Sequence, residues 1–209
     1  DNNYAFKHHE FIKWPEKTGV WGKIETHGRI APNSWNLRYE TEIVRDGKYS
    51  LRFEMRDGDC HRGDCGRKNK AGRSEVSFTG SFPKNTKGHL GNVWYAWSLY
   101  IPKGTHHIDP AYTILGQFKM PNDYVKQLNR IDSSGFDEDC PEIPLLFHFT
   151  GEGILMTKDG VLKCGDHERK IILPYEQIHN KWHDFLLNVS WTDKEDGHID
   201  LWINDKKVY

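Results

Sequence analysis

Hydrophobic and polar side chains alternate with a period of two through most of the chain. In YSLRFEM, residues 49–55, one face carries Leu51, Phe53 and Met55, and the other carries Arg52 and Glu54, followed by Arg56. The same alternation recurs in VWYAWSLYI (93–101), WHDFLLNVSW (182–191) and HIDLWIN (198–204). This pattern is typical of half-buried strands, because successive side chains of a strand point to opposite faces of its sheet.

Turn signals separate these segments and indicate the fold class. Gly, Asp and Asn gather in RDGK (45–48), KDG (158–160), EDG (195–197) and IND (203–205). A helical period is almost absent, and only LPYEQI, residues 173–178, predicts a short helix. Many short strands between frequent turns predict an all-β fold, a β-sandwich or jelly roll of two antiparallel sheets.

The chain has no internal repeat, linker or change in composition, so we expect a single domain over residues 1–209. Its last residues, HIDLWINDKKVY (198–209), have the pattern of a strand, a tight turn and the start of a returning strand. A sandwich that ended there would expose a strand edge. We therefore expect a domain that is C-terminally incomplete and lacks its last strands.

Composition narrows the class of partner. The 29 basic and 30 acidic residues give a net charge of −1, so no overall field favours nucleic acid. No apolar run reaches the about 18 residues that a membrane-spanning helix needs. We expect a monomer with neither a nucleic-acid nor a membrane partner, in which any electrostatic selectivity is local.

The four cysteines form an even set, Cys60, Cys65, Cys140 and Cys164. We expect two disulfides, Cys60–Cys65 and Cys140–Cys164, although two other pairings are open. Disulfides would indicate an oxidising location, secreted or periplasmic. The alternative is a zinc site of four thiolates near His61 and His167, but the spacing lacks the paired short knuckles of zinc ribbons.

Three of the predicted strands carry hydrogen-bonding or charged groups where a core strand would carry aliphatic ones. They are RSEVSF (73–78), ILGQFK (114–119) and LLFHFT (145–150). Alternation gives the side chains that share the polar faces as Arg73, Glu75, Gln117, Lys119 and His148. If the strands are neighbours, these groups line a groove suited to a polar polymer.

Strict alternation in ILGQFK predicts that Gln117 and Lys119 share their face with Leu115. Ile114 and Phe118 would then point to the opposite face. In LLFHFT the same rule places His148 opposite Phe147 and Phe149.

Each polar residue also has a simpler interpretation. Arg73 and Glu75 could form a surface ion pair worth under about 1 kcal/mol. Gln117 and Lys119 could decorate an exposed face, and His148 could be a hydrogen-bonded histidine of the core.

The charge clusters and short motifs of the sequence give weaker evidence of function than these three strands. The basic cluster could be a solvated loop, the usual fate of charge runs; it comprises Arg62, Arg67, Lys68, Lys70 and Arg73. An acidic run offers the oxygen ligands that calcium prefers but matches no calcium-loop spacing; it comprises Asp132, Asp137, Glu138, Asp139 and Glu142. We expect no cofactor or metal, with calcium as the weaker alternative. The E-x-D-x-E motif of many sandwich-fold glycoside hydrolases is absent, so hydrolysis by paired carboxylates has no obvious carriers.

The ordered segments resemble those of the heparin lyase I-like polysaccharide lyases, relatives of glucuronan and alginate lyases on a concanavalin-like jelly roll. The similar segments run from about residue 48 to the end: SLRFEMRDGDC, RSEVSF, VWYAWSLYIP, ILGQFK, KWHDFLLNVSW and HIDLWINDKKV. The resemblance implies cleavage of a uronate-bearing polysaccharide by β-elimination. The substrate would be an acidic polymer of the alginate, glucuronan or glycosaminoglycan kind.

The resemblance also implies roles for single residues. Arg73 would neutralise the substrate carboxylate with Glu75 orienting it, and Gln117 would hydrogen-bond the same carboxylate. Relatives often carry histidine where this chain has Lys119, so His148 is our substitute candidate for the general base. Further substrate contacts are expected from cationic and aromatic side chains, Arg67, Lys70, Trp94 and Tyr95.

The proton donor of the group is usually a tyrosine in a Y-x-K-x-G-x-Y-like stretch, and this sequence reaches Tyr209 without one. Either the proton donor lies beyond Tyr209, or this chain alone is not a complete catalyst. The resemblance makes a polysaccharide lyase the leading hypothesis. The alternative is a non-catalytic, lectin-like sandwich that holds sugar on the same face.

Overall fold

The computed structural model describes residues 23–25, 35–60, 65, 72–79, 91–108, 113–119, 143–159, 167–192 and 195–209. The chain divides into two compact units, Asp1–Lys84 and Asn85–Tyr209, and each is described by itself. Within the described ranges, no helix is long and apolar enough to cross a membrane.

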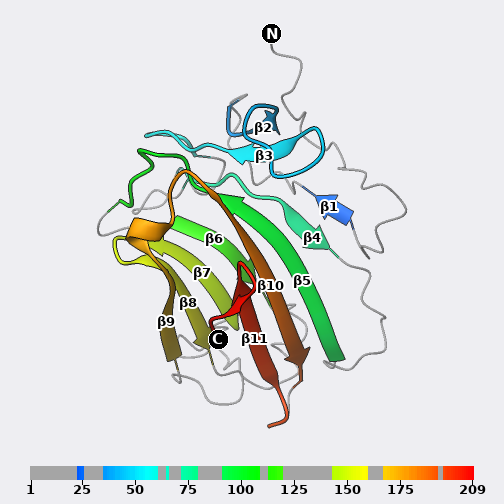
Figure 1. The fold of residues 1–209 in the computed structure, drawn as a ribbon. Coiled ribbons are helices and arrows are strands. Elements are labelled where there is room, and N and C mark those ends of the chain that lie inside the picture. Colours follow the sequence, from blue (N-terminus) through cyan, green and yellow to red (C-terminus); the bar gives the residue numbers. More distant parts are fainter. Residues whose placement is uncertain are drawn as a thin grey trace. The chain divides into compact units, whose positions relative to one another are not determined.

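The first unit contains two short antiparallel pairs (Figure 1). Strand β1 (Lys23–Glu25) pairs with β4 (Ser77–Thr79), and β2 (Leu37–Glu40) pairs with β3 (Ser50–Phe53). Buried Asn36 donates hydrogen bonds to the Glu54 carbonyl and to Asp59 Oδ2, both at 2.8 Å. These bonds fix the chain that runs from β3 toward Cys60.

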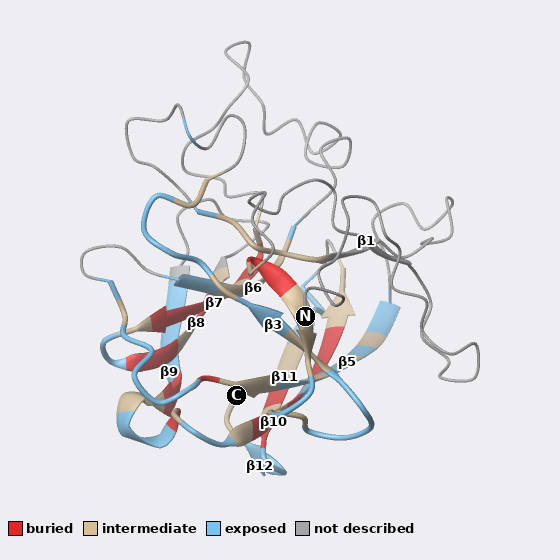
Figure 2. Ribbon diagram, turned by 90° about the horizontal axis from the view of Figure 1, so that it is seen from above, coloured by how far each residue is buried: buried red, intermediate tan, exposed pale blue. Residues whose placement is uncertain are grey.

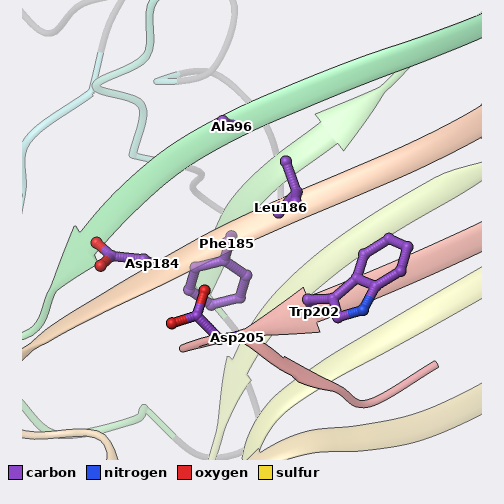
Figure 3. Close-up of a pocket in the computed structure, with 6 residues that line it drawn as sticks. All are labelled: Ala96, Asp184, Phe185, Leu186, Trp202 and Asp205. Atoms are coloured by element: carbon purple, nitrogen blue, oxygen red, sulfur yellow. The ribbon is translucent and has the colours of Figure 1, made fainter.

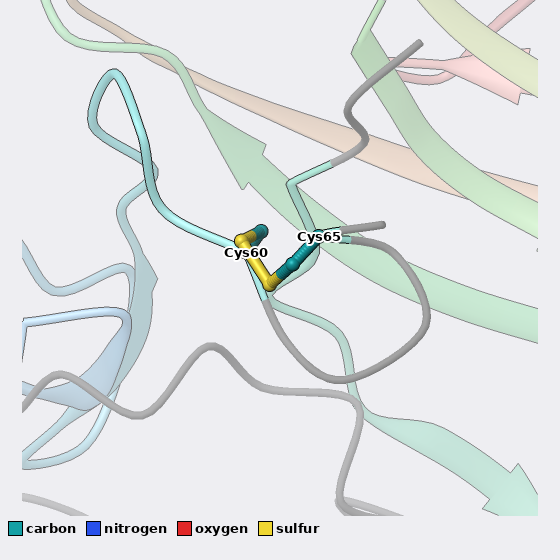
Figure 4. The surroundings of a disulfide bond; sticks show 2 residues. All are labelled: Cys60 and Cys65. Carbon is teal, nitrogen blue, oxygen red and sulfur yellow. A yellow bond between two sulfur atoms is a disulfide. The ribbon is translucent and has the colours of Figure 1, made fainter. Parts of the chain in front are cut away.

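A disulfide joins Cys60 to Cys65, as the sequence predicted (Figure 4). It closes a loop of sequence separation 5. Because both sulfurs are oxidised, neither can serve as a thiolate ligand, and the zinc alternative is wrong for this pair. Cys140 and Cys164 lie outside the described residues.

The second unit is built from two four-stranded antiparallel sheets (Figure 1). The sheet that we call sheet I has the order β6-β7-β8-β9, with β6 Thr113–Phe118, β7 Leu145–Thr150, β8 Gly153–Asp159 and β9 His167–Pro174. The sheet that we call sheet II has the order β12-β11-β10-β5, with β5 Gly91–Tyr100, β10 Trp182–Trp191, β11 His198–Ile203 and β12 Lys206–Lys207. The short helix expected over 173–178 is one 3-10 turn, Tyr175–Gln177.

The hydrophobic core of this unit lies between the two sheets. Sheet I contributes Phe147, and sheet II contributes Phe185 and the Trp97 indole, whose ring centroid is 5.6 Å from Phe147 and 5.0 Å from Phe185. Figure 2 shows the buried residues in red on strands of both sheets. The alternation read from the sequence is therefore confirmed: the odd-numbered residues of β5, β7 and β10 face the core.

Strand β6 departs from strict alternation because of a β-bulge. Ile114 pairs with His148, but the register shifts before Gly116, which pairs with Phe147. Because of the extra residue, Leu115 faces the core. Gln117 stays on the outer face, where it is the cross-strand partner of Leu146. The expectation that Leu115 shares a face with Gln117, and that Ile114 opposes it, was wrong.

Buried His183 ties the 3-10 turn and the β11–β12 hairpin to β10. Its Nε2 lies 3.1 Å from the Ile178 carbonyl and its Nδ1 lies 3.2 Å from Asn204 Nδ2. A neutral ring with hydrogen on Nε2 satisfies both contacts, whereas a protonated ring would oppose its Nδ1 hydrogen to an amide donor. Burial is the main reason that the pKa of His183 is lowered from its ordinary 6.5.

This arrangement predicts that acid weakens the fold through His183. The unfolded chain binds a proton near pH 6.5 but the folded chain does so only at lower pH, so stability is fully present above 6.5 and falls as pH drops below it. Urea unfolding between pH 5 and 8 should therefore show a smaller acid loss in His183→Gln than in the unaltered chain. Parallel pH profiles for the two proteins would contradict this role.

Candidate active site

The outer face of sheet I, which points away from the core, carries a row of side chains across all four strands. Gln117 of β6 pairs with Leu146 of β7, which pairs with Thr157 of β8, which pairs with Arg169 of β9. Cross-strand partners point to the same face of a sheet. Gln117 and Arg169 are thus at the two ends of one row, three strand spacings or about 14 Å apart.

His148 stands in the next row of the same face. It pairs with Ile114 on one side and with Leu155 on the other. This position makes it a diagonal neighbour of Gln117, at a backbone separation of about 7–8 Å that long side chains can bridge. The register confirms that Gln117 and His148 share one face, which also carries the apolar Ile114, Leu146 and Leu155.

His148 is only 8% exposed, and its Nε2 lies 3.3 Å from Thr157 Oγ1. A hydrogen bond between this hydroxyl and the ring nitrogen would fix the orientation of the ring. His148 therefore has the geometry of an oriented base. The same contact also fits a hydrogen-bonded structural histidine, and activity decides between the two.

Lys119 follows the end of β6, two residues after Gln117, and its side chain is exposed. An exposed ammonium group at the end of this strand suits the attraction of anionic substrates.

Thr157 and Arg169 are residues of this face that the sequence reasoning missed. The signal was present in HERKII, residues 167–172, where strict alternation separates Arg169 from Lys170. It could not be used without the strand order, because only the pairing of β8 with β9 connects Arg169 to the row of Gln117.

The opposite side of the same strand holds a separate charged cluster. The Tyr209 hydroxyl donates a 2.7 Å hydrogen bond to Glu168 Oε2, and Lys158 Nζ lies 2.8 Å from the same oxygen. The contact with Glu168 raises the pKa of Lys158, and the contact with Lys158 lowers the pKa of Glu168. This cluster links β8, β9 and the residues after β12, and its register places it away from Gln117 and His148.

Arg73 and Glu75 belong to the first unit, where Arg73 Nη1 lies 3.9 Å from Glu75 Oε1. Their side chains are 31% and 28% exposed, so both are accessible to a ligand. The prediction that they share a face agrees with this contact. Their predicted roles toward a substrate stay predictions.

Trp94 and Tyr95, both predicted to contact substrate, point to opposite faces of β5. The Tyr95 ring packs on Phe118 at 4.8 Å, and its hydroxyl accepts a 2.9 Å hydrogen bond from Trp191 Nε1. Burial raises the pKa of Tyr95. This placement gives Tyr95 a packing role rather than contact with substrate.

Trp94 lies on the outer face of sheet II, on the far side of the core from Gln117. It is exposed, but it shares no groove with Gln117 and His148. Arg67, Lys70 and the acidic residues 132–142 lie outside the described residues. In the described ranges no three His, Cys, Asp or Glu side chains come together to hold a metal ion.

Comparison with known proteins identifies the family. A family model described as polysaccharide lyase matches residues 13–209, and no curated protein matches the sequence. Among solved structures the fold is similar to that of an endo-β-1,4-glucuronan lyase from the fungus Trichoderma reesei, with a TM-score of 0.50 and 12% identity. The match covers 99% of this chain and 73% of the other, and it confirms the jelly-roll sandwich. The family model spans nearly the whole sequence, and the chain belongs to the polysaccharide lyase family.

Proposed function

We propose that this lyase cleaves a uronate-bearing, acidic polysaccharide by β-elimination on the outer face of sheet I. The observation that carries the proposal is the shared face of Gln117, His148 and Arg169, which combines an amide donor, an imidazole and a cation. The similar solved structure is a glucuronan lyase, which supports a uronate polymer as the substrate.

The reaction requires the removal of a weakly acidic proton. A base takes the proton from the ring carbon next to the carboxylate, a double bond forms to the neighbouring carbon, and the bond from that carbon to the glycosidic oxygen breaks. The departing oxygen then takes up a proton. The carboxylate gains negative charge as the first proton leaves, so a donor that strengthens with that charge lowers the barrier.

Gln117 suits the role of that donor. Its amide can donate to a carboxylate oxygen, and its position in β6 is fixed by pairing with Leu146 and by the bulge beside Gly116. A donor on a paired strand needs little reorganisation during the reaction. His148, a diagonal neighbour on the same face, then acts as the base, and Thr157 orients its ring.

Arg169 supplies positive charge at the far end of the row. It is exposed, and within the described ranges its guanidinium forms no ion pair. Arginine binds carboxylates through paired hydrogen bonds. In this proposal it holds the carboxylate of a sugar unit at a distance from the bond that is cleaved.

A location outside the reducing cytosol fits the Cys60–Cys65 disulfide, because such bonds persist in oxidising compartments. We extend the proposal to a secreted or periplasmic enzyme that acts as a monomer. Thiol labelling of protein recovered from the native source, with and without reductant, tests the location.

The substrate proposal is tested on a panel of glucuronan, alginate and glycosaminoglycans. We expect at least one polymer to yield products that absorb in the ultraviolet, because the new double bond is conjugated with the carboxylate. No product from any of them would overturn the proposal. Binding without product would instead favour the lectin-like alternative.

Arg169→Ala should raise KM for the best polymer about tenfold and leave kcat nearly unchanged, since one charge-assisted contact remote from the cleaved bond is lost. Steady-state kinetics with polymer and with the shortest cleaved oligouronate measures the effect. With the short substrate, Arg169→Ala and the unaltered chain should have the same KM, because this substrate does not reach across the four strands to Arg169. Lys181→Ala, an exposed cation outside sheet I, is the control. A loss of kcat equal on both substrates would contradict this role.

A further inference from the structure

The outer face of sheet II, on the far side of the core from Gln117, exposes a patch of aromatic and apolar side chains. Trp94 is 57% exposed and Leu186 is 41% exposed. The Trp94 ring stacks on Trp202, with centroids 5.7 Å apart and planes at 24°. The two indoles come from β5 and β11 and meet above the intervening strand β10. This patch contributes nothing to the core.

A shallow pocket of about 270 Å³ opens beside the Trp202 indole (Figure 3). Leu186 and Ala96, which are register partners, lie on one side, and Trp202 lies on the other. The small side chain of Ala96 leaves the surface low at this point of β5. Phe185 and two carboxylates, Asp184 and Asp205, complete the lining. One oxygen of Asp184, Oδ1, also accepts a 2.7 Å hydrogen bond from Ser98 Oγ.

The β11–β12 hairpin fixes the backbone position of Asp205. Asn204 and Asp205 have φ values of 49° and 64°, as a two-residue hairpin turn requires. Two hydrogen bonds of 2.9 Å fix this turn to β10: the Asn204 amide donates to the Asp184 carbonyl, and the Asp184 amide donates to Asn204 Oδ1. The backbone at the acidic end of the pocket is therefore tied to β10.

The charges of the pocket decide the class of ligand. Lys207 lies over the Trp202 ring, but its Nζ is 2.6 Å from Asp200 Oδ1, so its charge is compensated. The lining itself contains two acidic side chains and no basic one. Such a site accepts hydrogen bonds from hydroxyl groups and repels carboxylates.

We propose that this face is a second saccharide-binding site, which takes neutral pyranose units of a polysaccharide. The apolar faces of pyranose rings pack on exposed indole and leucine side chains, while their hydroxyl groups donate to Asp184 and Asp205. The site lies across the core from the proposed uronate face and has the opposite charge preference. It would hold the enzyme on a neutral glycan while the other face acts on an acidic one.

The test is isothermal titration calorimetry with cellohexaose, mannohexaose and xylohexaose, and with an oligoglucuronate as the acidic probe. We expect at least one neutral probe to bind, and Trp94→Ala to bind it about tenfold more weakly. Asp205→Asn keeps a residue that suits the positive φ, and it should also weaken binding of the neutral probe. Tyr49→Ala removes an exposed aromatic ring of the first unit and should bind like the unaltered chain.

Gln117→Ala separates this site from the proposed active site, because it should retain neutral binding even if it loses cleavage. Circular dichroism and thermal unfolding exclude misfolding as the cause of weak binding. Three results would overturn the proposal: no neutral probe binds, Trp94→Ala binds as well as the unaltered chain, or Asp205→Asn leaves neutral affinity unchanged. Sedimentation that shows a dimer lost on Trp94→Ala would also overturn it, because the face would then bind a second copy of the chain.

Discussion

Gln117→Ala is expected to lower kcat on the best uronate polymer by about 100- to 1000-fold, the usual cost of removing one donor that stabilises developing negative charge. The amide lies on a paired strand, one diagonal step from His148, and alanine leaves the carboxylate without that donor. KM should change much less than kcat, because the contact strengthens as charge develops.

Ile114→Ala is the matched control. Ile114 lies on the same face of the same strand and is exposed, but it offers no hydrogen bond. Initial rates followed by ultraviolet absorbance should fall far less for this variant than for Gln117→Ala. Equal losses of rate in the two variants would mean that the shape of this face, and not the Gln117 amide, supports cleavage. Gln117 would then have no role in the mechanism.

Leu187→Ala is expected to destabilise the second unit by about 2–5 kcal/mol, the range for large-to-small changes in a well-packed core. Leu187 is fully buried in the middle of β10, between Tyr95 of β5 and Leu201 of β11. Urea unfolding followed by tryptophan fluorescence measures the loss.

The adjacent residue provides the control for this change. Leu186 has the same side chain but points to the opposite face and is 41% exposed. Leu186→Ala should cost under about 1 kcal/mol, because its methyl groups already meet solvent. Similar destabilisation by both variants would contradict the sandwich, since only one of two successive residues can face its core.

The architecture could be predicted because a sandwich leaves a regular mark on its sequence. In β10 the buried Phe185, Leu187 and Val189 alternate with more polar or exposed residues, and the turn at 203–205 carries the Asn and Asp that its positive φ values favour. The bulge in β6 could not be predicted in this way. A single extra residue changes which side Leu115 faces without changing the composition of the strand.

The candidate site was predicted only in part, because alternation assigns faces within a strand but does not say which strands are neighbours. Gln117 and His148 come together since β6 pairs with β7. Arg169 lies on the same face as these two residues only because of the order of the four strands of sheet I. Trp94 does not lie on that face, because it belongs to sheet II. Aromatic side chains near each other in sequence, such as Trp94 and Tyr95, therefore give no reliable sign of a shared groove.

The most direct test of the account is the chemistry of the new chain ends when the best uronate polymer is cleaved in water enriched in heavy oxygen. β-Elimination breaks the bond without adding water, so mass spectrometry should find an unsaturated uronate at one end. If the new reducing ends are reduced with borohydride at once, before their hemiacetal oxygen exchanges with water, neither product should contain solvent oxygen. Incorporation of one heavy oxygen per cleavage, without ultraviolet absorbance, would show hydrolysis and contradict the proposed role of Gln117 and His148.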